Sequence, residues 1–88
     1  MIVIKIFTST PSCPSCDSEE KKARRVATKF PDGAVQIFTF AAMSEEAKKN
    51  NIFLTPAVMV GEELISAGIG ITEKEIEIAV EQRMKKPN

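Results

Sequence analysis

The sequence of 88 residues contains no histidine, tryptophan or tyrosine, and it has only two cysteines. A closed zinc site needs four nitrogen or sulfur ligands, which one copy of this chain cannot provide from histidine and cysteine. Two cysteines are also too few for the several disulfide bridges that hold small secreted domains together. The cysteines therefore need an explanation other than a complete zinc site or a secreted scaffold.

No charge of one sign is in excess, because 12 lysines and arginines balance 12 aspartates and glutamates. The chain therefore lacks the positive field that would hold a nucleic acid or an anionic membrane surface. No apolar run approaches the roughly 18 residues that a membrane-spanning helix requires. The apolar residues 2–7 lack the basic start and the cleavage site of a signal peptide. We expect a cytoplasmic protein whose partners include neither nucleic acid nor membrane.

Glycine and proline are few, with 4 and 5 residues, whereas 43% of the residues are hydrophobic and 27% are charged. This composition is typical of a globular protein and excludes collagen-like and disordered chains. A chain of this length has room for one hydrophobic core. We therefore expect residues 1–88 to form a single domain.

Hydrophobic periodicity predicts an α/β fold. Strands are expected where β-branched and aromatic residues cluster, at residues 2–7, 35–40, 57–60 and 64–67. Helices are expected where apolar residues recur at steps of three and four, from the cysteines to about residue 30, at 44–49 and from residue 72. The order β-α-β-α-β-β-α predicts a four-stranded mixed sheet with helices on both faces.

Two further predictions concern side chains. The phenylalanines and methionines after the first residue fall on periodic apolar positions, so we expect them in the core, at residues 7, 30, 38, 40, 43, 53, 59 and 84. Lys5 lies in the middle of the first strand and would point towards a covered face. We expect its long side chain to extend past the short second helix.

The two cysteines lie where the first strand gives way to the first helix, in the motif Cys13-Pro14-Ser15-Cys16. If Cys13 caps this helix, the amides of Ser15 and Cys16 can point at its sulfur. Pro14 then occupies the first helical position, where a missing amide costs nothing. The helix end favours a thiolate, so we predict a pKa of Cys13 below the ordinary value of about 8.5.

This arrangement suits disulfide exchange, because Cys16 is three residues on and shares a helix face with Cys13. The Cys13 thiolate would attack a substrate disulfide, and Cys16 would resolve the mixed disulfide. The acids Asp17, Glu19 and Glu20 lie in the first turns and oppose the activation of Cys13 by charge repulsion. The same cysteines could instead serve as ligands in a dimeric metal or iron–sulfur carrier, in which two chains supply four thiolates.

The motif and the stretch Ile52-Phe-Leu-Thr-Pro56 before the last two strands resemble the thioredoxin and glutaredoxin superfamily over nearly the whole chain. The resemblance implies that Pro56 is preceded by a cis bond and faces the cysteines. It also implies that the backbone of Thr55 pairs with an extended substrate, and that Gly68, with its neighbours Ala67 and Ile69, forms the other wall of that groove.

The departures from the pattern refine the resemblance. The chain has the size of a glutaredoxin, and Phe7 stands where full thioredoxins carry a buried acid, so proton removal from Cys16 would fall to water or another group. Residues 67–72 read Ala-Gly-Ile-Gly-Ile-Thr and lack the Gly-Gly-acid pattern of glutathione-using glutaredoxins. The chain is most similar to the small prokaryotic redoxins, of the archaeal type.

The resemblance implies a thiol–disulfide oxidoreductase that reduces protein disulfides. Such a protein acts as a monomer and needs no bound cofactor besides the Cys13–Cys16 disulfide. It receives electrons from a reductase or thiol donor that the sequence does not identify.

Overall fold

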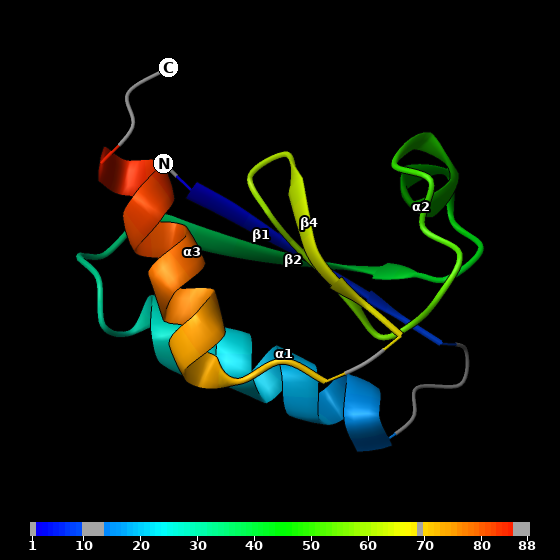
Figure 1. The fold of residues 1–88 in the computed structure, drawn as a ribbon, viewed down its shortest axis with the longest axis horizontal. Helices are drawn as coiled ribbons and strands as arrows, with labels where there is room; N and C mark the ends of the chain where they lie inside the picture. The colour runs from blue at the N-terminus through cyan, green and yellow to red at the C-terminus, as the bar shows by residue number, and fades with distance from the viewer. Residues whose placement is uncertain (1, 10–13, 69, 86–88) are drawn as a thin grey trace.

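The computed structural model describes residues 2–9, 14–68 and 70–85. Seven elements follow one another as β1 (Ile2–Thr8), α1 (Pro14–Ala27), β2 (Val35–Ala41), α2 (Glu45–Lys49), β3 (Ala57–Val60), β4 (Glu63–Ala67) and α3 (Glu73–Lys85). Figure 1 shows the sheet with α1 and α3 side by side on one face and α2 on the other. The predicted element order and the predicted α/β fold are confirmed.

The four strands form one mixed sheet in the order β2-β1-β3-β4. β1 and β2 are parallel over their whole length, from Ile2 opposite Val35 onward. β3 runs antiparallel to β1 on one side and to β4 on the other. The two central strands are therefore β1 and β3. The end of β1, which precedes the cysteines, and the start of β3, which follows Pro56, lie at the same end of the sheet.

The alternation of side chains along the central strands builds two cores. Ile4 and Ile6 of β1 lie on the face covered by α1 and α3, where they pack with Val58, Val60, Ala23, Val26, Ile76 and Val80. Phe7 lies on the opposite face and packs with Ala47 of α2 and with Ile52, Ala57 and Met59. Because both faces are covered, all four residues of β3 are buried.

Lys5 shares the α2 face with Phe7, and its ammonium does reach past the core. Its Nζ donates to Oε2 of Glu46 at 2.6 Å, so that β1 is tied to α2 by an ion pair. This hydrogen bond, together with one from Asn50, lowers the pKa of Glu46 below its ordinary value of 4.5. The mid-strand lysine is thus explained by a partner on the short helix.

The ends of the helices follow from local side-chain chemistry. The hydroxyl of Ser44 accepts from the amide of Ala47 at the start of α2, and Asn51 follows the helix with a φ of 58°. Thr72 and Glu75 exchange hydrogen bonds at the start of α3, in which each side chain accepts from the other residue's amide. α1 ends at Ala27, earlier than predicted, although Phe30 still packs against the core.

The prediction that every phenylalanine and methionine lies in the core is wrong at four positions. Phe38, Met43, Phe53 and Met84 are 47%, 79%, 84% and 40% exposed. α2 has only five residues and cannot cover the full length of β2, which leaves Phe38 open to solvent. Met43 and Phe53 lie in the segments on either side of α2, outside both cores. Among the described helices, none is long and apolar enough to cross a membrane.

Candidate functional site

The cysteine motif lies at the start of α1. α1 begins at Pro14, which is the residue predicted for the first helical position, and Ser15 and Cys16 follow in its first turn. Cys13 lies outside the described residues, and the side chains of Pro14, Ser15 and Cys16 are likewise outside the description. The roles predicted for these residues therefore remain predictions.

The segment before β3 lies beside the end of β1. Phe7, near the carboxyl end of β1, pairs with Ala57, which directly follows Pro56. The Thr55–Pro56 peptide bond is cis, which is the geometry implied by the resemblance. Pro56 is buried and Thr55 is half-buried. The end of β1, which precedes the cysteines in the chain, therefore lies beside the start of β3, which directly follows the cis peptide bond.

Gly68 joins this segment from the other side. Its amide donates to the carbonyl of Pro56 at 2.9 Å, just beyond the end of β4. Its φ is +80°, and a Cβ at this position would lie 3.1 Å from Cβ of Leu54. The structure therefore brings together Thr55, Pro56 and Gly68, the three predicted substrate-binding residues, whereas Ile69 lies outside the described residues.

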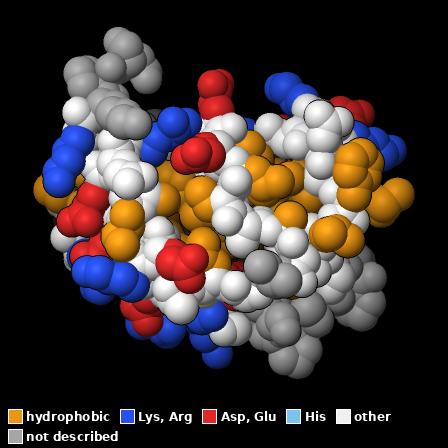
Figure 2. All heavy atoms as spheres, in the orientation of Figure 1, with side chains coloured by type: hydrophobic (Ala, Val, Ile, Leu, Met, Phe, Trp, Pro, Cys, Tyr) orange, Lys and Arg blue, Asp and Glu red, His pale blue; other side chains and the backbone are white. Residues whose placement is uncertain are grey.

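An apolar surface adjoins the cis bond. Phe53 and Leu54 directly precede Thr55 and are 84% and 61% exposed, and Met43 on the other side of α2 is exposed as well. Figure 2 shows hydrophobic side chains gathered on the side of the molecule where α2 and the segment before β3 lie. Exposed apolar side chains that gather in a patch often mark a site of contact with another molecule.

Sequence reasoning missed the burial of Glu19, which it placed with Asp17 and Glu20 among the acids of the first helical turns. Glu19 is only 2% exposed and faces the core side of α1. Its Oε1 accepts from the amide of Ile71 and from Nζ of Lys22, both at 3.3 Å. Lys22 also donates to the carbonyl of Ile71 at 2.9 Å, so the pair holds α1 against the segment that precedes α3.

A signal for this burial was present in the helical period. Cys16 and Ala23 are seven residues apart on the apolar face of this helix, and that spacing leaves position 19 or 20 on the same face. The structure shows that Glu19 takes this place and that Glu20, which pairs with Arg24, lies on the outer side. A charged residue on the apolar face of a predicted helix was therefore the signal that this side chain is buried.

The second carboxylate oxygen of Glu19 is unusual. Oε2 is buried and accepts no hydrogen bond from the described residues. Ser66 Oγ is the other such atom in the described part of the chain, and Ser66 lies opposite Val58, whose side chain packs on the α1 face. Buried polar atoms are nearly always paired in folded proteins, so an orphan oxygen one helical turn from Cys16 calls for an explanation.

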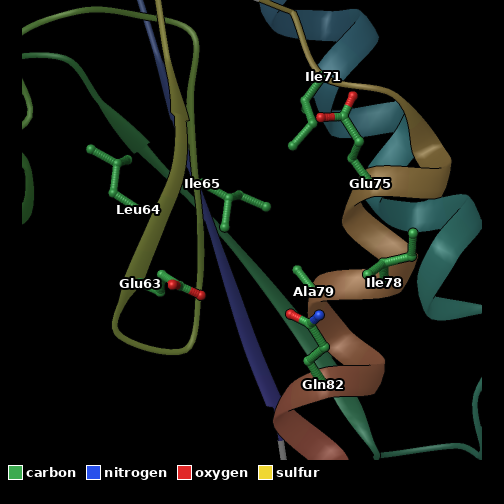
Figure 3. A pocket seen from close by; sticks show the side chains of 8 residues that line it. All are labelled: Glu63, Leu64, Ile65, Ile71, Glu75, Ile78, Ala79 and Gln82. Carbon is green, nitrogen blue, oxygen red and sulfur yellow. The ribbon is translucent and has the colours of Figure 1, made fainter.

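A separate cavity lies between β4 and α3. Its volume is about 340 Å³, and it is lined by Glu63, Leu64, Ile65, Ile71, Glu75, Ile78, Ala79 and Gln82. Figure 3 shows that Ile65 points towards α3, whereas Leu64 points away from it. None of the lining residues carries a thiol, and we assign this cavity no part in the chemistry.

Comparison with known proteins yields one family and a common fold. The family model described as "Thioredoxin domain" matches residues 2–81. A solved structure described as that of a malarial protein is 8% identical, with a TM-score of 0.71 over 93% of this chain and 96% of the other. The oxidised form of mitochondrial thioredoxin 3 from Saccharomyces cerevisiae is 19% identical, with a TM-score of 0.68 over 92% of this chain and 77% of the other. No curated protein matches the chain significantly.

Proposed function

Because the chain belongs to the thioredoxin-domain family, we propose that it is a thiol–disulfide oxidoreductase that reduces protein disulfides through Cys13 and Cys16. The observation that carries this proposal is the place of the motif. Cys16 lies in the first turn of the helix that follows β1, and the cis Thr55–Pro56 bond lies beside the end of that strand. A helix start favours a thiolate, which is the reactive form in disulfide exchange.

The reaction transfers two electrons to the substrate in two steps. The Cys13 thiolate attacks one sulfur of the substrate disulfide, which forms a mixed disulfide and releases the other substrate sulfur as a thiolate. Cys16 then loses its proton and attacks the Cys13 sulfur. This step breaks the mixed disulfide, releases the second substrate sulfur as a thiolate and leaves a Cys13–Cys16 disulfide. A reductase or thiol donor restores the two thiols.

The surface around the cis bond suits a protein substrate. Thr55 is half-buried and carries backbone groups beside the sheet, where an extended peptide can form main-chain hydrogen bonds. Phe53 and Leu54 supply adjoining apolar area. We propose protein disulfides in the cytoplasm as substrates, with the protein acting as a monomer and without a bound cofactor.

Single cysteine variants test the assignment of roles. Cys13→Ser should abolish disulfide exchange, since the thiolate that attacks the substrate is lost. Cys16→Ser should still attack and should accumulate the mixed disulfide, because the resolving thiol is lost. The measurement is mass spectrometry of each variant after incubation with a disulfide-bonded protein. Equal residual turnover in the two variants would contradict the assigned roles.

A further inference from the structure

Glu19 is a carboxylate in a position where burial destabilises its charged form. It is 2% exposed, and burial of a charge is unfavourable unless the charge is paired and hydrogen-bonded. Lys22 and the amide of Ile71 satisfy Oε1, and Oε2 accepts nothing from the described residues. A purely structural acid would be expected to use both oxygens.

The position of Glu19 in α1 links it to the proposed redox pair. Glu19 follows Cys16 by three residues in the same helix, so the two positions are neighbours along one side of α1. Glu19 is also the one buried charged side chain among the described residues, so it is the carboxylate placed inside the protein to accept the proton of Cys16. Among the described residues, Lys22 forms an ion pair with Glu19, and its ammonium supplies the counter-charge.

Resting on the function proposed above, we propose that Glu19 is the proton acceptor for Cys16 in the resolving step. The S–H bond of Cys16 breaks and its proton moves to the free Oε2 of Glu19. The resulting thiolate attacks Cys13, which forms the Cys13–Cys16 bond and breaks the bond between Cys13 and the substrate. The substrate sulfur leaves as a thiolate, and the proton passes from Glu19 to it or to solvent.

The two steps can be observed separately with a chromogenic aromatic disulfide. The attack by Cys13 releases one coloured thiolate in a phase that depends on reagent concentration, and the attack by Cys16 releases a second in a phase that does not. The aromatic thiolate needs no protonation to leave, so the second phase reports the deprotonation and attack of Cys16. The phases are followed by stopped-flow absorbance across neutral pH.

Glu19→Gln should slow the second phase by about 10- to 100-fold near neutral pH without slowing the first phase, since general acid–base catalysis contributes at least this much. The second-phase rate of the wild type should vary little with pH between about 6 and 8. That of Glu19→Gln should climb with pH towards the ordinary cysteine pKa of about 8.5. Glu20→Gln, which removes the same charge from the next residue of α1, is the matched control and should keep the rate and pH profile of the wild type in the second phase.

Two outcomes would overturn the proposal. One is a second phase in Glu19→Gln with the wild-type rate and pH profile, and the other is an equal slowing of both phases, which would indicate a structural role alone. If Glu19→Gln does not fold, Glu19→Asp replaces it; this variant must slow only the second phase and keep the wild-type pH profile. Absence of any second phase in the wild type would instead contradict the proposed function itself.

Discussion

Gly68 shows how a single backbone conformation contributes to the site. It adopts a φ of +80°, which side-chain-bearing residues rarely adopt, and its amide holds the carbonyl of Pro56. Gly33 has nearly the same φ of +81°, but no atom lies within 4 Å of the Cβ that a substitution would add there. The two glycines therefore separate the cost of the backbone conformation from the cost of crowding against Leu54.

Gly33→Ala should lower the free energy of unfolding by about 1 kcal/mol, because it pays only for the positive φ. Gly68→Ala should lower it further, since the new Cβ lies 3.1 Å from Cβ of Leu54 and one of the two segments must shift. Urea denaturation of the two variants and the wild type measures the difference. An equal loss in both would show that the contact with Leu54 is not constraining.

The sequence could predict single residues only where a local rule applies to them. Ser44 and Thr72 were recognisable as helix caps because capping depends on neighbours in the chain. The burial of Glu19 and the exposure of Phe53 depend on which segments pack against them in three dimensions. Residue type alone predicts an exposed glutamate and a buried phenylalanine, and the structure shows the opposite for both of these residues.

At the scale of elements, α2 is the least anchored helix. It has five residues and contributes a single buried residue, Ala47. Its attachment to the sheet includes the ion pair between Glu46 and Lys5, which keeps the pKa of Glu46 below 4.5 in the folded state. This ion pair therefore stabilises the fold above the unfolded-state pKa, and its contribution is lost as the pH falls through the lower, folded-state value.

Glu46→Gln should reduce the loss of stability that the wild type shows when the pH falls from about 7 to about 3, because the variant has no charge to lose at this position. Glu45→Gln removes an exposed acid from the same first turn of α2 and is the matched control for the effect of the helix dipole. The free energy of unfolding is measured by denaturation at both pH values. The same pH dependence in Glu46→Gln and the wild type would contradict the assignment.

Elements themselves were predictable to within a few residues, because strands and helices impose periods of two and of three to four on the sequence. The largest difference is at α1, which ends at Ala27 although the apolar stripe continues to Phe30. There the hydroxyl of Thr28 donates to the carbonyl of Arg25 and closes the helix locally. Periodicity records which residues face the core and does not record where the helical hydrogen bonds stop.

At the scale of the whole molecule, α1 and α3 are held together on one face of the sheet by both packing and charge. Val26 of α1 shares a core with Ile76 and Val80 of α3, and the exposed ion pairs Arg25–Glu73 and Lys29–Glu77 join the two helices at 2.8 and 3.0 Å. Exposed ion pairs contribute little each, so the shared core is the main attachment. The arrangement holds the C-terminal end of α1 against α3 and the sheet.

The central claim is that Cys13 and Cys16 form a reversible disulfide within one chain. The most direct test equilibrates the protein in thiol buffers of defined potential and determines the oxidised fraction by mass spectrometry. The account predicts the loss of two hydrogen atoms in a single two-electron transition, at a potential between about −270 and about −200 mV. If no intramolecular disulfide forms at any potential, the redox assignment is wrong, and a metal or cluster carried between two chains by the same cysteines becomes the function to test.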